Sequence, residues 1–374
     1  MALRAVARVN LAAIERNVAA MRSRLAAGVG LCAVVKADGY GHGAAPVARA
    51  ALAGGANRLA VATAAEAVAL RAAGVMAPVL VMGALSGDEL ADVLEAGAEV
   101  TAWTPEFIAA LERAAPRQPV GVHVKLDSGM GRLGTRRERE ALEVAARVAA
   151  ADASLRLAGA MTHFASAGED PEFVNVQLAR FEPFVERLRA RWGRVVAHAA
   201  NSAATLTEPR SHFDFVRCGI AIYGCDPMNV NPADWGLEPA LELGSYVAAV
   251  KPAEPGDTVG YGRTFTAAEA TTIATVPIGY GDGVRRALSN NCDVLVGETR
   301  YPLVGTVSMD NITLDLGRPT DVVVGDPVTL IGGAHGQRIT AEDLARRIGT
   351  ISYEVVCGIS DRVPRLYHRD GAPA

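Results

Sequence analysis

A lysine, Lys36, ends the apolar run LCAVV at residues 31–35, immediately before a loop that reads ADGYGHG. An ammonium group is costly to bury, so most lysines at strand ends simply extend to solvent. This chain of 374 residues, however, uses arginine for nearly all its basic positions and keeps three lysines, Lys36, Lys125 and Lys251. Only a primary amine condenses with a carbonyl group, so a lysine retained among arginines is a candidate for covalent chemistry.

Polar side chains also follow the ends of other apolar runs. They are Tyr40 and His42 after the first run, then Lys125, Arg132, His163, Ser202 and Arg217. Each has an ordinary alternative: His163 as a core histidine, Ser202 as a helix cap, and Arg217 as half of an ion pair. In a parallel barrel, chemistry lies at the carboxyl ends of the strands. Such residues at several strand ends therefore predict one shared site.

Pyridoxal phosphate unites these residue types, because it needs a lysine amine, an anion site and a group that faces its ring nitrogen. The segment Cys218-Gly219-Ile220 is expected to start a short helix whose free N–H groups can hold a phosphate. Hydroxyl groups of Ser202 and Tyr40 would add to that site. The motif GYGHG does not match the dinucleotide-binding fingerprint, so that cofactor class is excluded.

Eight strand-like segments alternate with helical ones over the first 225 or so residues, which predicts a (β/α)8 barrel. A Rossmann-like sheet is the alternative if one or two strands are miscounted. We place the barrel at residues 10–238. Beyond residue 240 the chain is rich in short β segments with turn residues between them, so residues 239–374 are expected to form a mostly β domain. The helical pattern TAEDLARRIG interrupts it, with Thr340 as the expected cap.

Composition narrows the class of protein. Half of the residues are hydrophobic and the net charge is −4 with both signs interspersed, which argues against a nucleic-acid or membrane-surface protein. The five cysteines form no CxxC pair, so they are expected to be reduced thiols of a cytoplasmic protein without a metal site. We find neither a signal-peptide core nor an apolar stretch of the roughly 18 residues that a membrane helix needs.

With these residues in place, the chain closely resembles alanine racemase, a pyridoxal-phosphate enzyme, nearly from end to end. The matching segments occur in the family's order and are AVVKADGYGHG, KLDSGMGRLG, THFA, ANSAAT, RCGIAIYG, GYGRTFTA, IGYGDG, VSMDN and SYEVVCGISDRVPR. The resemblance implies a barrel followed by a β domain, to which residues 1–9 add a strand. It also implies a homodimer with shared active sites.

The resemblance further implies a role for individual residues. Lys36 would carry the cofactor as a Schiff base and act as one catalytic base, with Tyr261 of the partner subunit as the other. Arg217 would face the pyridine nitrogen, and His163 would link Arg217 to the incoming tyrosine. Arg132 and the backbone of Met309 would hold the substrate carboxylate, and Lys125 would be the lysine that many members carry as a carbamate. The cofactor phosphate would be held by Tyr40, Ser202, Gly219, Ile220 and Tyr353.

The expected reaction interconverts L-alanine and D-alanine and supplies D-alanine for peptidoglycan. Two bases on opposite faces remove and return the α-proton without either having to cross the substrate. The competing hypotheses are a serine or broad-specificity racemase, a basic-amino-acid decarboxylase of the same fold, and a non-catalytic pyridoxal-phosphate-binding barrel. Two positions depart from the family pattern: Thr306 stands where an arginine is often found, and Asp38-Gly39 is an unusually flexible pair.

Overall fold

A computed structural model describes residues 3–114, 118–151, 153–334 and 336–374. The chain divides into two compact units. The first, the barrel unit, comprises Ile14–Gly39 and Ala44–Ile222, and the second, the β unit, comprises the residues up to Ala13, Tyr40–Gly43 and Tyr223–Ala374. This division lies between residues 222 and 223, whereas the boundary expected from the sequence lies after residue 238.

Eight strands form the sheet of the barrel unit in the order β8-β7-β6-β5-β4-β3-β2-β9, and all seven pairings are parallel. Two backbone hydrogen bonds join the last two edges, from Asp214 N–H to the Ala197 carbonyl (3.1 Å) and from Arg217 N–H to the Ala200 carbonyl (2.9 Å). The predicted barrel is therefore confirmed as a nearly closed one. Its strands are β2 (Gly30–Val34), β3 (Arg58–Val61), β4 (Val79–Val81), β5 (Glu99–Ala102), β6 (Val120–Lys125), β7 (Leu155–Met161), β8 (Val196–His198) and β9 (Phe215–Cys218).

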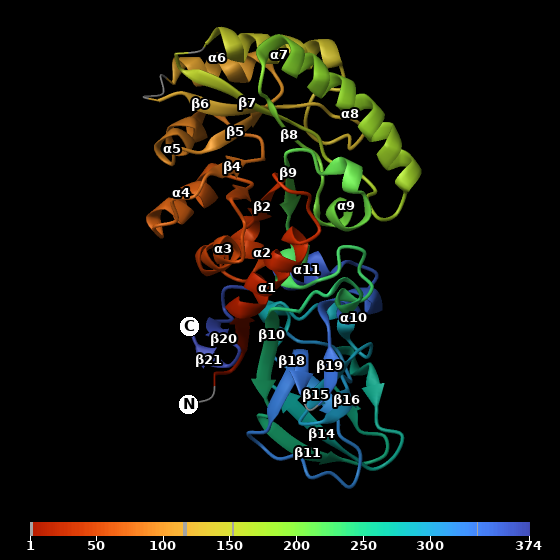
Figure 1. Ribbon diagram of the computed structural model, residues 1–374. Helices are drawn as coiled ribbons and strands as arrows, with labels where there is room; N and C mark the ends of the chain where they lie inside the picture. The colour runs from red at the N-terminus through yellow and green to blue at the C-terminus, as the bar shows by residue number, and fades with distance from the viewer. Residues whose placement is uncertain (1–2, 115–117, 152, 335) are drawn as a thin grey trace. The chain divides into compact units, whose positions relative to one another are not determined.

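Helices alternate with these strands and surround them (Figure 1). Side chains cap two of these helices: Thr63 accepts a hydrogen bond from Glu66 N–H, and Thr104 accepts one from Phe107 N–H. Every residue of β2 and of β6 is buried, as expected for strands covered on both faces. The helices are α1 (Leu11–Arg22), α3 (Ala44–Ala53), α4 (Ala64–Ala72), α5 (Leu90–Glu95), α6 (Pro105–Arg113), α7 (Glu138–Ala150), α8 (Pro171–Trp192) and α9 (Ser202–Thr207).

The β unit is built mainly on antiparallel sheets, as the sequence predicts. Strand β1 (Val6–Asn10) pairs antiparallel with β10 (Leu241–Tyr246) and parallel with β20 (Arg365–Arg369), so the N-terminal segment lies inside the largest sheet of this unit. The remaining strands are β11 (Ala249–Ala253), β12 (Thr258–Val259), β13 (Phe265–Thr266), β14 (Thr271–Val276), β15 (Asp293–Val296), β16 (Thr299–Pro302), β17 (Ile312–Asp315), β18 (Pro327–Ala334), β19 (Gln337–Ile339) and β21 (Ala372–Pro373).

Two short helices complete the β unit, α10 (Ala341–Arg347) and α11 (Ser352–Cys357). Thr340 caps α10 in a capping box with Asp343, which confirms the cap expected from the sequence. A search of the described residues finds no helix with the length and apolarity needed to cross a membrane.

Candidate active site

Lys36 lies just beyond β2, which ends at Val34, and begins the short element α2 (Lys36–Tyr40). The backbone after Lys36 is left-handed, with φ of 51° at Ala37, 49° at Asp38, 61° at Gly39 and 52° at Tyr40. Each non-glycine residue costs about 1–2 kcal/mol in this region, and aspartate and glycine tolerate it better than most residues. Asp38 and Gly39 therefore suit the left-handed turn that follows strand β2.

Contacts within the barrel unit hold this turn in its strained conformation. Gly39 N–H donates to the Val35 carbonyl (2.9 Å), and Asp38 Oδ1 accepts a hydrogen bond from Ala44 N–H (2.8 Å). Ala37 N–H donates to Glu66 Oε1 at the start of α4 (2.6 Å). A backbone that is strained but fixed from three directions is a common feature of functional sites.

Arg217, on β9, is 2% exposed and makes four hydrogen bonds within the barrel unit. Its Nη1 bonds to His198 Nδ1 (2.8 Å), and its Nη2 bonds to the Thr162 and Ala199 carbonyls (2.8 and 2.9 Å) and to His163 Nδ1 (3.1 Å). Its Nε is buried and finds no acceptor in the part of the chain that the structure describes. A buried donor without a protein acceptor fits a ligand atom that accepts, such as an unprotonated pyridine nitrogen.

The cationic side chains of the barrel unit lie within electrostatic range of one another. Burial, followed by the charges of Arg217 and Arg132, lowers the pKa of Lys125 to about 8, and Lys36 contributes in the same direction. Burial and the same four cations hold the pKa of His163 well below its ordinary value, so this imidazole is neutral. An anionic ligand or modification in this position would meet a concentrated positive charge.

Ser202 joins the ends of two barrel strands. Asn201, rather than Ser202, caps α9, because its side chain accepts a hydrogen bond from Ala204 N–H (3.0 Å). The Ser202 hydroxyl instead accepts a bond from Gly219 N–H (2.9 Å) and a longer one from Ala221 N–H (3.4 Å). Gly219 precedes a 3₁₀ turn at Ile220–Tyr223, so the helical start expected at this point is present. A hydroxyl and several backbone N–H groups thus gather at one place, as an anion site requires.

Tyr40 and Tyr353 belong to the β unit, where their ring centroids are 6.2 Å apart. Tyr40 is 7% exposed and also packs on Tyr223 at 4.9 Å. Burial raises the pKa of Tyr40, so its hydroxyl stays protonated and can donate a hydrogen bond. The rings of the two tyrosines predicted to bind phosphate therefore lie close together in the β unit.

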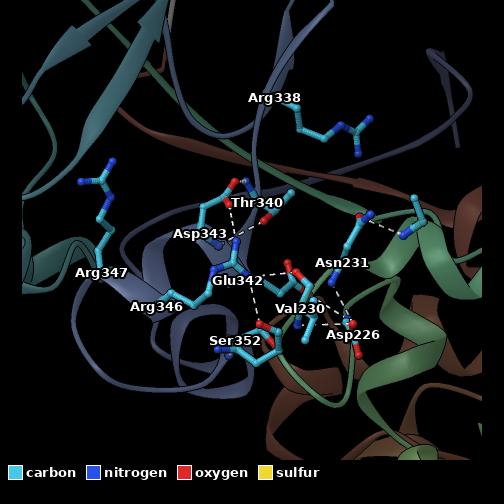
Figure 2. Close-up of polar contacts among 12 residues, drawn as sticks. Asp226, Val230, Asn231, Arg338, Thr340, Glu342, Asp343, Arg346, Arg347 and Ser352 are labelled. Carbon is cyan, nitrogen blue, oxygen red and sulfur yellow. Dashed lines mark hydrogen bonds and ion pairs between the residues drawn. The ribbon is translucent and has the colours of Figure 1, made fainter.

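A polar network holds α11, the helix that carries Tyr353. The side chain of Asn229 accepts a bond from Ser352 N–H (2.9 Å) and donates one to the Thr350 carbonyl (3.2 Å). The loop around Asn229 is fixed in turn by two buried carboxyl groups (Figure 2): Asp226 accepts from Asn231 N–H (2.8 Å), and Glu342 accepts from Asp226 N–H (2.8 Å). This loop, far from Tyr353 in the sequence, therefore sets the start of its helix.

Tyr261 and Met309 are among the most exposed large apolar side chains of the β unit, at 75% and 52%. Tyr261 lies in a 3₁₀ turn at Tyr261–Arg263, and its carbonyl accepts a hydrogen bond from the Thr306 hydroxyl (2.8 Å). Thr306, one of the two positions noted above as departing from the expected pattern, thus supports the backbone of the tyrosine turn. The described residues of its own chain thus leave most of Tyr261 and about half of Met309 exposed.

Sequence reasoning missed three polar side chains that lie below Arg217, namely His198, His123 and Glu99. A signal for His123 was present, because it stands two residues before Lys125 on the same strand, and alternating residues of a strand share a face. His198 likewise stands in an apolar strand segment, where a polar residue requires a partner. Nothing in the local sequence marks Glu99, which begins an otherwise mostly apolar strand.

Comparison with known proteins identifies relatives over nearly the whole chain. Residues 9–227 match the family model described as "Alanine racemase, N-terminal domain", and residues 240–367 match "Alanine racemase, C-terminal domain". The chain is 42% identical to the alanine racemase of Symbiobacterium thermophilum, with 96% of each chain covered. It is 44% identical to the alanine racemase of Mycolicibacterium vanbaalenii, over 96% of this chain and 94% of that protein.

Solved structures give the same result. The crystal structure of alanine racemase from Bacillus anthracis with bound L-Ala-P superimposes with a TM-score of 0.93 at 37% identity, and covers 100% of this chain and 97% of that chain. The structure of alanine racemase from the D-cycloserine-producing Streptomyces lavendulae gives a TM-score of 0.92 at 37% identity, with 98% of each chain covered. The similarity therefore includes both units.

Proposed function

The chain belongs to the alanine racemase family, and from this premise we propose that it interconverts L- and D-alanine with Lys36 and Tyr261 of the partner subunit as its two bases. Alanine racemases depend on pyridoxal 5'-phosphate, and so does this enzyme. When bound, the cofactor acidifies the α-proton of the amino acid by accepting electron density. The remaining steps are proton transfers and binding contacts that the protein's own side chains must perform.

The observation that supports this mechanism best is the buried Nε of Arg217, which has no acceptor within the described residues. A guanidinium group only donates hydrogen bonds, so the ring nitrogen facing it must accept and remain unprotonated. A neutral ring withdraws electrons less strongly than a protonated one. The site therefore favours a brief loss and return of one proton over transamination or decarboxylation.

Two groups of residues would orient the cofactor and the substrate. We assign the phosphate to the Ser202 hydroxyl and the Gly219 and Ile220 N–H groups, together with Tyr40 and Tyr353. The gathering of N–H groups around Ser202 supports this assignment. We assign the substrate carboxylate to Arg132 and the backbone of Met309, because a guanidinium group pairs a carboxylate through two parallel hydrogen bonds.

The second base supports a homodimer. Lys36 would hold or release a proton at Nζ on one face of the substrate, and the Tyr261 hydroxyl would do so on the other. Tyr261 is 75% exposed in its own chain, which favours contact with a second copy. His163, which accepts from Arg217 Nη2 at 3.1 Å, is assigned to the link between Arg217 and that tyrosine.

The physiological role that we propose is the supply of D-alanine for peptidoglycan by a cytoplasmic enzyme. Serine or broad-specificity racemisation is the principal alternative. The ring of Tyr353 argues for a small substrate, because it would crowd side chains much larger than a methyl group. Arg217 argues against a decarboxylase, since decarboxylation benefits from a stronger electron sink.

A coupled assay tests the proposal. The purified protein is incubated with pyridoxal phosphate and either L-alanine or L-serine, and the D-isomer is detected with D-amino-acid oxidase. We expect D-alanine to form with a kcat/KM at least tenfold above that for D-serine. Equal rates for the two substrates would favour the broad-specificity alternative, and no D-isomer from either would refute the proposed function.

A further inference from the structure

A chain of polar side chains leads from Arg217 through the barrel interior to Glu99, the first residue of β5. Arg217 Nη1 lies 2.8 Å from His198 Nδ1, His198 Nε2 lies 2.9 Å from His123 Nδ1, and His123 Nε2 lies 3.1 Å from Glu99 Oε2. The first three residues are at most 2% exposed. Strands β9, β8, β6 and β5 supply one member each.

The protons of this chain can be arranged in only one way that leaves every bond intact. Glu99 is an acceptor, so His123 must carry its proton on Nε2 and accept at Nδ1. His198 must then donate from Nε2 and accept at Nδ1 from Arg217, which can only donate. A second proton on either imidazole would set one N–H against another within the chain. Consistently, burial lowers the pKa of both His123 and His198.

Packing keeps the two imidazole rings in this alignment. The His198 ring stacks on Phe215 with a centroid distance of 4.2 Å, and the His123 ring meets His198 edge-on at 4.9 Å. Rings held on two sides cannot turn to exchange their nitrogens without displacing Phe215. The direction in which the hydrogen bonds are donated therefore depends on Glu99, at the end of the series, rather than on rotation of the rings.

Glu99 supplies the negative charge that Arg217 lacks locally. All the Arg217 partners among the described residues are neutral, being two carbonyl groups and two imidazoles. Arg132 adds further positive charge to the same region. The Glu99 carboxylate also pairs with Arg156 (2.9 Å) and Arg58 (3.4 Å), so it is held as an anion at the opposite end of the chain.

We propose that Glu99 and His123 are positioning residues for racemisation: the Glu99 carboxylate fixes the tautomers of both histidines and so orients Arg217 as a charged donor. The link to the reaction rests on the proposed contact between Arg217 and the cofactor ring. The assignment of the tautomers does not rest on that contact, because it follows from the protein's own hydrogen bonds. In metal sites, carboxylates that do not touch the metal orient the metal-binding histidines in the same way, by accepting a hydrogen bond from the other ring nitrogen.

Glu99→Gln is the test variant, because it removes the charge and keeps the shape and the ability to accept a hydrogen bond. Glu112→Gln is the matched control, because Glu112 also pairs with an arginine, Arg147 at 3.0 Å, but on the outer helices. The tautomers are read from long-range ¹H–¹⁵N spectra of the holoenzyme labelled with ¹⁵N-histidine. Wild type should show both His123 and His198 protonated on Nε2, and Glu99→Gln should show mixed protonation of His123.

Kinetics then test the link to the reaction. We expect Glu99→Gln to lower kcat for alanine by about tenfold, the lower end of the effect of losing an outer-layer partner, with KM changed less than twofold. The control should leave the spectra, kcat and KM unchanged. His123→Phe keeps a ring in place and removes both nitrogens, and it provides a second route to the same test. The double variant Glu99→Gln/His123→Phe should lose no more activity than His123→Phe alone, because the two residues act in series.

Wild-type histidines protonated on Nδ1, or tautomers that ignore the Glu99 change, would overturn the proposal. Altered tautomers with an unchanged kcat would also overturn it, because Glu99 would then not act on the reaction. Additive losses of kcat in the double variant would also overturn it, because Glu99 and His123 would then act independently. These results differ from a failure of the proposed function, which would show as an absence of racemisation in the wild-type enzyme.

Discussion

The backbone N–H of Ala37 donates a 2.6 Å hydrogen bond to Glu66 Oε1, and so ties the residue after Lys36 to the start of helix α4. The other oxygen of Glu66 accepts from Ala62 N–H (2.7 Å) and Thr63 N–H (3.1 Å). One carboxylate therefore closes the capping box of α4 and fixes the left-handed turn that presents the lysine. The residue next to the lysine is thus held by a glutamate 29 positions further along the chain, which carries no sign of function in the sequence.

Glu66→Ala should reduce activity as well as stability. The variant loses three accepted N–H bonds, which we expect to cost about 2–3 kcal/mol of unfolding free energy. It also releases a turn in which Ala37 is unfavourable by about 1–2 kcal/mol, so Lys36 should lose its fixed position and kcat should fall about tenfold. Urea unfolding and steady-state kinetics provide the two measurements.

Glu89→Ala is the control for this prediction. Glu89 closes an equivalent capping box with Ser86, and both of its side-chain hydrogen bonds among the described residues come from Ser86 rather than from the Lys36 turn. Its loss should cost about 1 kcal/mol of stability and leave kcat unchanged. If both variants kept full activity at a temperature where both are folded, the bond between Ala37 and Glu66 would have no role in placing the lysine.

The sequence was sufficient to predict the barrel and the residues around its rim. Eight apolar segments separated by capped helices specify the architecture, because strands covered on both faces are continuously apolar. The same reasoning placed Lys125, His163, Ser202 and Arg217 near strand ends. It predicted less well how Lys36 is presented, because alanine and tyrosine do not signal a left-handed backbone, and the fold imposes it.

The sequence could not predict which side chains hydrogen-bond to one another over long distances along the chain. The bond between His123 and His198 spans 75 positions and joins strands that are not neighbours in the sheet. Alternation along a strand shows that a side chain faces inward, but it does not show what meets it there. Glu66 and Glu99 were missed for the same reason, since a carboxylate at a helix start or a strand start is ordinary.

Lys36→Ala should abolish racemisation in both directions and remove the visible absorbance that the lysine gives to the bound cofactor. Alanine has no amine, so it can neither hold the cofactor covalently nor move the proton. Lys251→Ala is the control, because Lys251 lies on β11 and its removal should change neither property. Normal turnover and absorbance in Lys36→Ala would contradict the assignment.

Tyr261→Ala should lose racemisation and retain the cofactor. If Tyr261 serves the other subunit, mixing Lys36→Ala and Tyr261→Ala chains should restore activity, because a mixed dimer has one site with both defects and one intact site. About a quarter of wild-type activity is expected when the two chains exchange freely, since half the dimers are mixed and each has one good site of two. Tyr301→Ala, on strand β16, serves as the matched tyrosine control.

The outcome of the mixing experiment separates two arrangements. Recovery with the expected yield means that the two bases come from different chains. No recovery, after mass spectrometry has verified that the subunits exchanged, means that one chain supplies both. In that case the homodimer would be unnecessary for catalysis.

Lys125 provides the last prediction, because its environment lowers the pKa of its amine. Burial and the charges of Arg217 and Arg132 lower the pKa of Lys125 to about 8, and Asp127 opposes them only in part. Asp127 is engaged elsewhere, by Arg136 Nε (3.2 Å) and the N–H groups of Gly129 and Gly131. Since only an unprotonated amine adds carbon dioxide, the lowered pKa favours the carbamate, a carboxylate that could hold Arg132 in a charge-assisted pair.

Two substitutions distinguish a carbamate from a bare cation at this position. Lys125→Arg keeps the positive charge but cannot be carbamylated. If the group is a carbamate, both Lys125→Ala and Lys125→Arg should raise KM for alanine about tenfold, and acetate or chloride should partly rescue Lys125→Ala by filling the vacated anion site. If the group is an ammonium, Lys125→Arg should behave like wild type, and this result would contradict the carbamate.

The pH dependence gives an independent check with a definite sign. A base whose folded pKa is lowered to about 8 is mostly protonated at pH 7 and mostly neutral at pH 9. Carbamate formation in bicarbonate should therefore increase over this interval, and KM should fall with it. A ¹³C signal from enzyme equilibrated with labelled bicarbonate should rise between pH 7 and pH 9 in wild type and be missing in Lys125→Arg. A KM that falls over the same interval in Lys125→Arg as well would assign the pH dependence to another group.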